Sequence, residues 1–239
     1  MKYQAILFDM DGTLVPMEIH GFTKGYFQML FRKLAKYGLD PTQFGKNMWA
    51  GVSAMVKNDG AATNEDRFWQ AFSQLTGMDK DTINGDCLDF YGNEFHQAKQ
   101  FTGENPLAAE AVRLAREKAE KVILATNPMF PMVGQETRMG WVGLKPADFE
   151  LVTSYEYERF CKPNPMYYTS ICQRMGLNPA QCLMIGNDEY EDMYAGTKAG
   201  MNCWLVTDWM TSSPEHPWNG PKGTFVETVE MLKSLESYA

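Results

Sequence analysis

Short apolar runs alternate with helix-like segments along the second half of the chain. Strands are predicted at residues 121–126, 151–154, 182–186 and 202–207. Helices are predicted at residues 106–118, 130–139, 165–175, 191–199 and 225–235. Continuous apolar runs of this length are typical of strands covered on both faces, and parallel neighbours need a helical crossover between them. The alternation therefore predicts an α/β fold with a doubly wound parallel sheet.

The first strand of this sheet is expected near the N-terminus, at residues 5–8 (AILF). Asp9 ends the apolar run, and Asp11 follows at the alternate position. Alternate residues of an extended segment point to the same side, so both carboxylates are expected beyond the carboxyl end of the strand, where open α/β sheets bind ligands. Two adjacent carboxylates repel each other unless a cation neutralises them, and oxygen ligands suit Mg²⁺.

Residues 19–97, which follow this strand, carry helical signals and no convincing strand. Apolar residues recur there at spacings of three and four, as on one face of a helix. Asp40 and Pro41 are expected to begin one helix. Thr63 and Asp66 resemble a capping box at the start of the next, and a further helix is predicted at residues 81–98.

The chain is therefore expected to contain two domains. Residues 1–16 and 102–239 are predicted to form the α/β core domain, and residues 17–101 an all-helical domain inserted into it. The stretch 208–223 is rich in Pro, Gly and Ser and is predicted to be a loop.

Polar residues follow three further predicted strands. Thr126 and Asn127 come after one strand, Lys162 lies in a proline-flanked loop after another, and Asp188 and Asp192 follow a third. A hydroxyl, an amide and a lysine suit an oxyanion, and carboxylates at a helix start suit a cation. Each of these signals alone is ordinary turn or cap chemistry. Because the carboxyl ends of parallel strands meet at one edge of a sheet, together they predict a single site.

Composition limits the partners and the compartment. The net charge of −8 disfavours nucleic acid and anionic membranes, so a phosphate would have to be attracted locally. The five cysteines form no CxxC pair and are expected to be reduced thiols of a cytoplasmic protein. No secretory signal and no membrane span are expected, and the oligomeric state is left open.

The order of the motifs resembles that of the haloacid dehalogenase (HAD) superfamily. The sequence has DxDGT, then a strand ending in Thr126, then Lys162-Pro163, then GND and Asp192. The stretches LFDMDGTLV and CLMIGNDEYEDM are similar to those of its phosphatase-like members. The resemblance implies a Rossmann-like core and a helical cap inserted after the first motif.

The resemblance also implies roles for individual residues. Asp9 would be the nucleophile that forms an aspartyl-phosphate, and Asp11 would protonate the leaving oxygen and then activate water. Thr126 and Asn127 would bind the phosphoryl oxygens, and Lys162 would offset the negative charge.

Mg²⁺ is the cofactor that the resemblance implies. Asp9, the backbone carbonyl of Asp11 and Asp188 would hold it. Many relatives have Gly-Asp where this chain has Gly186-Asn187-Asp188, so two registers are possible. Either Asp188 is the ligand, supported by Asp192, or Asn187 takes the ligand position. We favour Asp188.

The expected function is hydrolysis of the phosphate monoester of a small metabolite. Asp11 favours phosphatase over dehalogenase chemistry, because dehalogenases of this superfamily generally lack an acid at that position. A phosphomutase of the same superfamily keeps both aspartates and is one alternative. A non-catalytic HAD-like binding protein is another, and it would be expected to have lost a catalytic position.

Overall fold

The computed structural model describes residues 2–238, and the outermost residues of the predicted core domain, 1 and 239, lie outside that range. Six parallel strands form one sheet in the order β3-β2-β1-β4-β5-β6. The strands are β1 Tyr3–Phe8, β2 Ala119–Leu124, β3 Leu151–Val152, β4 Cys182–Gly186, β5 Asn202–Val206 and β6 Lys222–Gly223. Phe8 is paired with Leu124 on one side and with Ile185 on the other, so β1 lies at the centre of the sheet.

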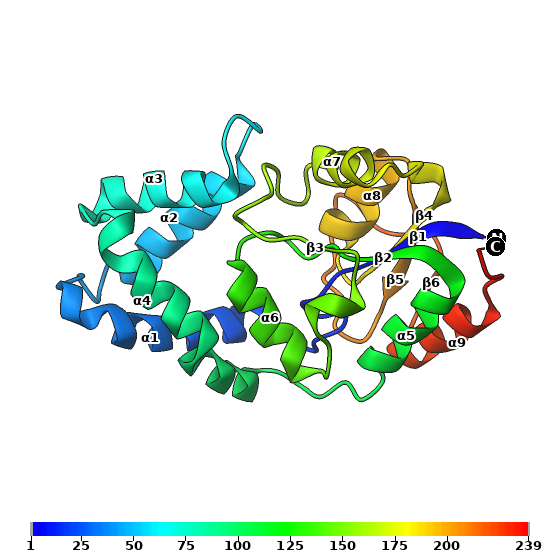
Figure 1. Ribbon diagram of the computed structural model, residues 1–239, viewed down its shortest axis with the longest axis horizontal. Coiled ribbons are helices and arrows are strands. Elements are labelled where there is room, and N and C mark those ends of the chain that lie inside the picture. The colour runs from blue at the N-terminus through cyan, green and yellow to red at the C-terminus, as the bar shows by residue number, and fades with distance from the viewer. Residues whose placement is uncertain (1, 239) are drawn as a thin grey trace.

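Helices cover both faces of the sheet, as predicted for a doubly wound fold. They are α5 Ala108–Lys118, α6 Met132–Trp141, α7 Pro165–Met175, η5 Glu189–Tyr194, α8 Ala195–Lys198 and α9 Phe225–Ser234, with short turns η3 Pro146–Asp148 and η4 Pro179–Gln181. Ile6 and Phe8 pack into one apolar cluster and Ala5 and Leu7 into another, because alternate residues of a strand face opposite sides. In Figure 1, α7 and α8 lie on one side of the sheet, and α5 and α9 lie on the other.

The segment between β1 and α5 is all helical, and it is called the helical insertion below. Its elements are α1 Ile19–Leu34, η1 Ala35–Tyr37, α2 Phe44–Val56, α3 Asn64–Thr76, α4 Lys80–Gly92 and η2 Glu94–Phe101. It forms the left-hand lobe in Figure 1, beside the sheet. The exact joints of the two domains, at residues 16–17 and 101–102, stay a prediction.

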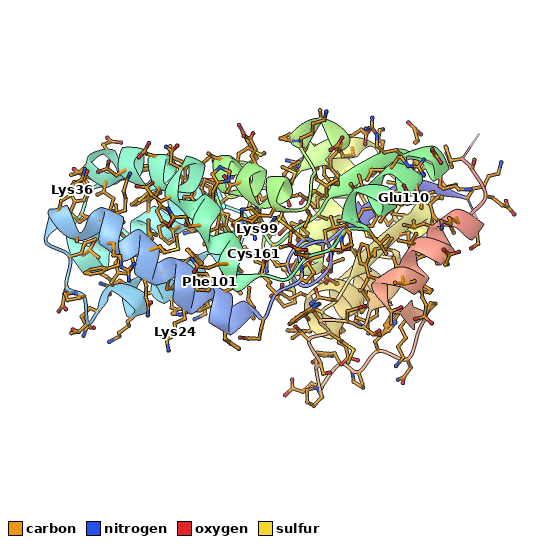
Figure 2. All side chains as sticks on the ribbon, turned by 90° about the horizontal axis from the view of Figure 1, so that it is seen from below. Lys24, Lys36, Lys99, Phe101, Glu110 and Cys161 are labelled. Carbon is orange, nitrogen blue, oxygen red and sulfur yellow. The ribbon has the colours of Figure 1, made fainter. Side chains whose placement is uncertain are left out.

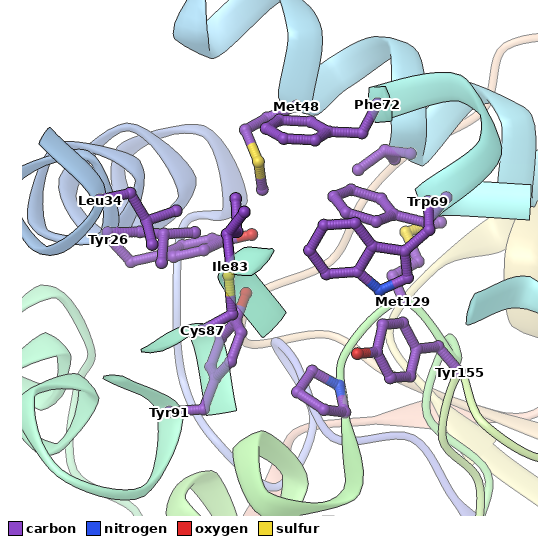
Figure 3. A pocket seen from close by; sticks show the side chains of 14 residues that line it. Tyr26, Leu34, Met48, Trp69, Phe72, Ile83, Cys87, Tyr91, Met129 and Tyr155 are labelled. Atoms are coloured by element: carbon purple, nitrogen blue, oxygen red, sulfur yellow. The ribbon is translucent and has the colours of Figure 1, made fainter. Parts of the chain in front are cut away.

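An apolar cavity of about 30 Å³ lies where the helical insertion meets the core (Figure 3). Side chains of the insertion, including Trp69, Phe72 and Ile83, line it together with Met129 and Tyr155 of the core. Side chains of both parts of the molecule therefore meet around one apolar cavity.

Polar contacts also fix the helical insertion to the core. The amide of Asn64 donates to the carbonyl of Glu158 at 2.8 Å, and the amide of Glu65 donates to the carbonyl of Tyr155 at 2.9 Å. Asn64 Nδ2 also lies 3.3 Å from the sulfur of Cys161, which lies between the two lobes in Figure 2. These contacts place the start of α3 beside the segment that follows β3.

Several predicted boundaries were wrong. The predicted loop 208–223 contains β6, a two-residue edge strand of Lys and Gly that has no apolar pattern to reveal it. The second helix begins at Phe44 and not at Pro41, since the carboxylate of Asp40 accepts from the amide of Thr42 in a local turn. The helix predicted at 81–98 ends at Gly92 and continues as the separate turn η2.

The capping box was predicted correctly. Thr63 Oγ1 accepts from the amide of Asp66, and the Asp66 carboxylate accepts from the amide of Thr63. Among residues 2–238, no helix is both long and apolar enough to cross a membrane.

Candidate active site

Asp9 directly follows β1, and its side chain is 9% exposed. Its backbone amide donates to the carbonyl of Ile185 at 2.9 Å, which extends the pairing with β4 by one residue. The Oδ1 atom accepts from Lys162 Nζ at 2.7 Å, and Oδ2 accepts from Thr13 Oγ1 at 3.3 Å. The carboxylate is therefore held at both oxygens at the carboxyl edge of the sheet.

Gly12 makes the tight turn after Asp9 possible. Its φ is +83°, in the region that favours glycine, and a Cβ there would lie 2.2 Å from Asn187 Nδ2. A side chain at residue 12 would thus push the turn away from the loop that follows β4.

Lys162 lies between two carboxylates. Its Nζ donates to Asp192 Oδ1 at 2.6 Å as well as to Asp9, and the Lys162 side chain is 1% exposed. Asp192 Oδ1 also accepts from the Tyr168 hydroxyl at 3.1 Å, and its Oδ2 accepts from the amides of Asn187 and Asp188, each at 3.1 Å. Asp192 therefore fixes both the lysine and the start of the last acidic motif.

Negative charge exceeds positive charge in this buried region. Burial, reinforced by the neighbouring Asp192 and Asp11, raises the pKa of Asp9 to about 7, although Lys162 opposes the rise. Burial and the adjacent Asp188 raise the pKa of Glu191 to about 8. Burial works to lower the pKa of Lys162, but Asp192 and Asp9 outweigh it and hold that pKa well above its usual value.

Thr126, which follows β2, presents a buried hydroxyl. The residue is fully buried, and Oγ1 has no hydrogen-bond partner within residues 2–238. Its carbonyl accepts from the Thr153 hydroxyl at 2.7 Å and from the Tyr167 hydroxyl at 2.8 Å, so the backbone is fixed. A buried polar atom without a partner is rare in folded proteins, and it suits a ligand oxygen.

Asn127 is joined to the acidic motif. Its Nδ2 donates to Glu191 Oε2 at 2.9 Å, and its Oδ1 has no partner among the described residues. The loops after β2 and β4 are therefore linked beside Lys162.

Asn187 and Asp188 differ in what their side chains contact. Asp188 Oδ1 accepts from the amides of Tyr190 and Glu191, each at 2.8 Å, and so caps η5. Asn187 Oδ1 accepts from Thr13 Oγ1 at 3.1 Å, the same hydroxyl that donates to Asp9. Both candidate metal ligands, Asn187 and Asp188, thus lie at the same edge of the sheet as Asp9. Asn187 is linked to Asp9 through the Thr13 hydroxyl.

Arg138 is a site residue that the sequence analysis missed. It lies on α6, is fully buried, and pairs through Nη1 with Asp11 Oδ2. A single arginine in a helix normally lies at the surface, so its sequence position alone carries no signal. The ion pair joins residues 127 positions apart in the chain.

The donor atoms in this region fit a hard cation. No group of three or more His, Cys, Asp or Glu residues forms a ready-made metal site within residues 2–238. The available atoms are instead the Asp9 carboxylate, the Asn187 amide oxygen and the carboxylate of Asp188, and all of them are oxygens. Oxygen donors beside an excess of buried carboxylates suit Mg²⁺.

A family model described as "Hydrolase: haloacid dehalogenase-like hydrolase" matches residues 3–200. Among curated proteins, a glyceraldehyde 3-phosphate phosphatase from Methanothermobacter thermautotrophicus is 25% identical over 236 residues, which cover 97% of this chain and 99% of that protein. One of the same name from Methanopyrus kandleri is 22% identical over 83% of this chain and 81% of its own length.

A solved structure of similar fold is a HAD phosphatase from Thermococcus onnurineus. Its TM-score is 0.62 at 17% identity, and the match covers 99% of this chain and 100% of the other. At this identity the likeness concerns the fold alone.

Proposed function

This chain belongs to the haloacid dehalogenase-like hydrolases and acts on phosphate esters, and we propose that it hydrolyses the monoester of a small metabolite through an aspartyl-phosphate on Asp9. The observation that carries the proposal is the buried ion pair between Asp9 Oδ1 and Lys162 Nζ, 2.7 Å long, at the carboxyl edge of the sheet. Beside a lysine, and at the same sheet edge as the Thr126 hydroxyl, which has no partner within residues 2–238, a carboxylate is suited to attack a phosphorus atom.

The proposed reaction has two steps. In the first, a carboxylate oxygen of Asp9 attacks phosphorus, the bond to the ester oxygen breaks, and Asp11 gives that oxygen a proton. In the second, Asp11 takes a proton from water, the water oxygen bonds to phosphorus, and Asp9 is released. Thr126 and Asn127 bind the phosphoryl oxygens, and Lys162 offsets their charge, which accounts for much of the acceleration expected in phosphoryl transfer.

Mg²⁺ is the proposed cofactor. When bound, it would neutralise charge on the phosphoryl oxygens and on Asp9. Its proposed ligands are the Asp9 carboxylate, the Asp11 backbone carbonyl and Asp188, with Asn187 as the alternative third ligand. Each oxygen of Asp192 already accepts two hydrogen bonds, whereas each oxygen of Asp9 accepts one, so Asp192 is better suited to a supporting role.

Three-carbon sugar phosphates are the first substrates to test, because the curated relatives are named for glyceraldehyde 3-phosphate. Localisation in the cytoplasm, and the lack of nucleic-acid and membrane partners, stay predictions from the cysteine pattern and the net charge.

The decisive experiment measures phosphate release from p-nitrophenyl phosphate by wild type and Asp9→Asn, with Mg²⁺ and with EDTA. We expect turnover that needs the metal and that falls by about three orders of magnitude or more in Asp9→Asn, because the amide cannot act as the nucleophile. A folded wild type that binds Mg²⁺ but releases no phosphate from this ester or from a panel of metabolite phosphates would contradict the proposal.

The phosphomutase alternative makes a different prediction. A mutase would convert one sugar phosphate into its isomer and release little phosphate. Trapping of BeF₃⁻ on Asp9 without hydrolysis of any ester would favour it, whereas no trapping would favour a binding protein.

A further inference from the structure

Arg138 occupies an unusual position for a charged residue. It is fully buried in α6, and the proposed reaction described above does not use it. Its Cζ lies 4.0 Å from the centre of the Phe130 ring. Taking a charge out of water is costly unless it is paired, so the partners of the guanidinium are informative.

A chain of buried hydrogen bonds fixes the orientation of Arg138. The carbonyl of Thr153, just after β3, accepts from Gln135 Nε2 at 3.1 Å. Gln135 Oε1 accepts from Arg138 Nη2, and Arg138 Nη1 donates to Asp11 Oδ2. The backbone at the end of β3 is thereby connected to the Asp11 carboxylate through two side chains that are both fully buried.

The two carboxylate oxygens of Asp11 consequently differ in their hydrogen bonding. Oδ2 accepts from Arg138, whereas Oδ1 is buried and has no partner among the described residues. A guanidinium has only donors and cannot accept a proton. When Asp11 is protonated, its proton must therefore be on Oδ1 for the contact with Arg138 to persist.

We propose that Arg138 is a positioning residue for proton transfer, an inference that rests on the phosphatase function proposed above. It holds Asp11 at Oδ2 and leaves Oδ1 to exchange the proton. Oδ1 gives its proton to the ester oxygen as the bond from phosphorus to that oxygen breaks. It then takes a proton from water as the water oxygen bonds to phosphorus and the bond to Asp9 breaks.

The test uses two esters that differ in their need for a proton. p-Nitrophenolate is a stable anion and leaves with little help, whereas phenolate needs protonation as it departs. We expect Arg138→Met to lower kcat about tenfold or less for p-nitrophenyl phosphate and about a hundredfold for phenyl phosphate, with KM changed by less than about threefold. Arg138→Lys should restore part of the phenyl phosphate activity.

Thr137→Val is the matched control on the same helix. It removes the buried hydrogen bond from Thr137 Oγ1 to the carbonyl of Tyr91, 2.7 Å long, without contacting Asp11. Stability should fall, but the ratio of the two kcat values should stay that of wild type. If the Arg138 variants do not fold, Gln135→Met, which removes the partner of Nη2, should shift the ratio in the same direction by a smaller factor.

A double variant tests whether Arg138 acts through Asp11. In an Asp11→Asn background, Arg138→Met should cost less than about twofold in kcat, because the residue it positions no longer transfers protons. Equal losses on both esters, full additivity with Asp11→Asn, or a change confined to KM would each overturn the proposal, the last by indicating that Arg138 binds the substrate. If wild type hydrolyses neither ester with Mg²⁺ present, the phosphatase proposal fails first, and this one fails with it.

Discussion

The buried hydroxyls of Thr126 and Thr153 differ in their hydrogen bonding, and this difference allows effects on stability to be separated from effects on activity. Thr126 Oγ1 is buried without a partner among the described residues. The hydroxyl of Thr153 instead lies 2.7 Å from the carbonyl of Thr126 and 3.0 Å from the hydroxyl of Tyr167. An unpaired buried hydroxyl costs free energy, whereas a paired one contributes to folding.

At the scale of a single residue, we predict that Thr126→Val stabilises the folded protein and lowers its phosphatase activity. Removing an unpaired buried hydroxyl should raise the free energy of unfolding by up to about 1 kcal/mol. Losing a donor to the phosphoryl oxygens should lower kcat about tenfold to a hundredfold. Thermal unfolding and phosphate release would be measured on the same preparation.

Thr153→Val is the control for this prediction, because it removes a hydroxyl that has partners. It should lower the free energy of unfolding by about 1–2 kcal/mol. If Thr126→Val were destabilising and fully active, the proposed role of Thr126 would be wrong.

At the start of the helical element η5, the side chain of Asp188 has two roles. Asp188 Oδ1 caps the helix through the amides of Tyr190 and Glu191, and the same residue is the favoured metal ligand. Burial, reinforced by Asp192, raises the pKa of this carboxyl above its usual value, which indicates that its charge is poorly solvated. Both purposes depend on oxygen atoms, but only the second depends on the negative charge.

We therefore predict that Asp188→Asn preserves the fold and weakens metal binding. Asn caps helices about as well as Asp, so the free energy of unfolding should change by less than about 0.5 kcal/mol. Removing the charge should raise the Mg²⁺ concentration for half-maximal activity about tenfold or more. A magnesium titration of activity, with calorimetry of Mg²⁺ binding, measures both.

The variant Asn187→Asp tests the alternative assignment of the metal ligand. If Asn187 were the ligand, a carboxylate at that position would strengthen Mg²⁺ binding, and Asp188→Asn would leave it nearly unchanged. That pair of results would assign the register to Asn187.

At the scale of the whole molecule, one apolar cluster spans the helical insertion and the core. It contains Phe8 of β1, Phe22 and Phe95 of the insertion, and Phe130 beside α6. Phe95 is fully buried, and its ring centre lies 5.9 Å from that of Phe130 and 5.3 Å from that of Trp141. Continuous packing of this kind couples the stability of the two parts.

We predict that wild type unfolds in a single transition and that Phe95→Ala destabilises both parts together. Truncating a fully buried phenylalanine should lower the free energy of unfolding by about 3–5 kcal/mol. Near-ultraviolet and far-ultraviolet circular dichroism should give coincident transitions. Leu75→Ala, at a residue that is 56% exposed, is the control and should have little effect. Two separate transitions in wild type would refute the coupling.

The sequence by itself predicted a parallel, doubly wound sheet and the edge of that sheet at which the candidate site lies. Strand β4 and helix α7 have the predicted bounds, because an uninterrupted apolar run and a proline-to-glycine helix pattern are local signals. The motif order also indicated that Asp9, Lys162 and Asp192 converge, which the ion pairs confirm. Parallel strands bring their carboxyl ends to one edge, so this inference needed no side-chain coordinates.

Only the tertiary structure decided which side chains pair across that edge. Arg138 pairs with Asp11, which lies on a distant segment of the chain. The Thr13 hydroxyl contacts both Asp9 and the distant Asn187. Strand β6 likewise exists because β5 offers a free edge, and not because Lys222 and Gly223 favour a strand. Periodicity and capping act over a few residues, whereas the choice of a buried ionic partner depends on how whole elements pack, and that information is not local in the chain.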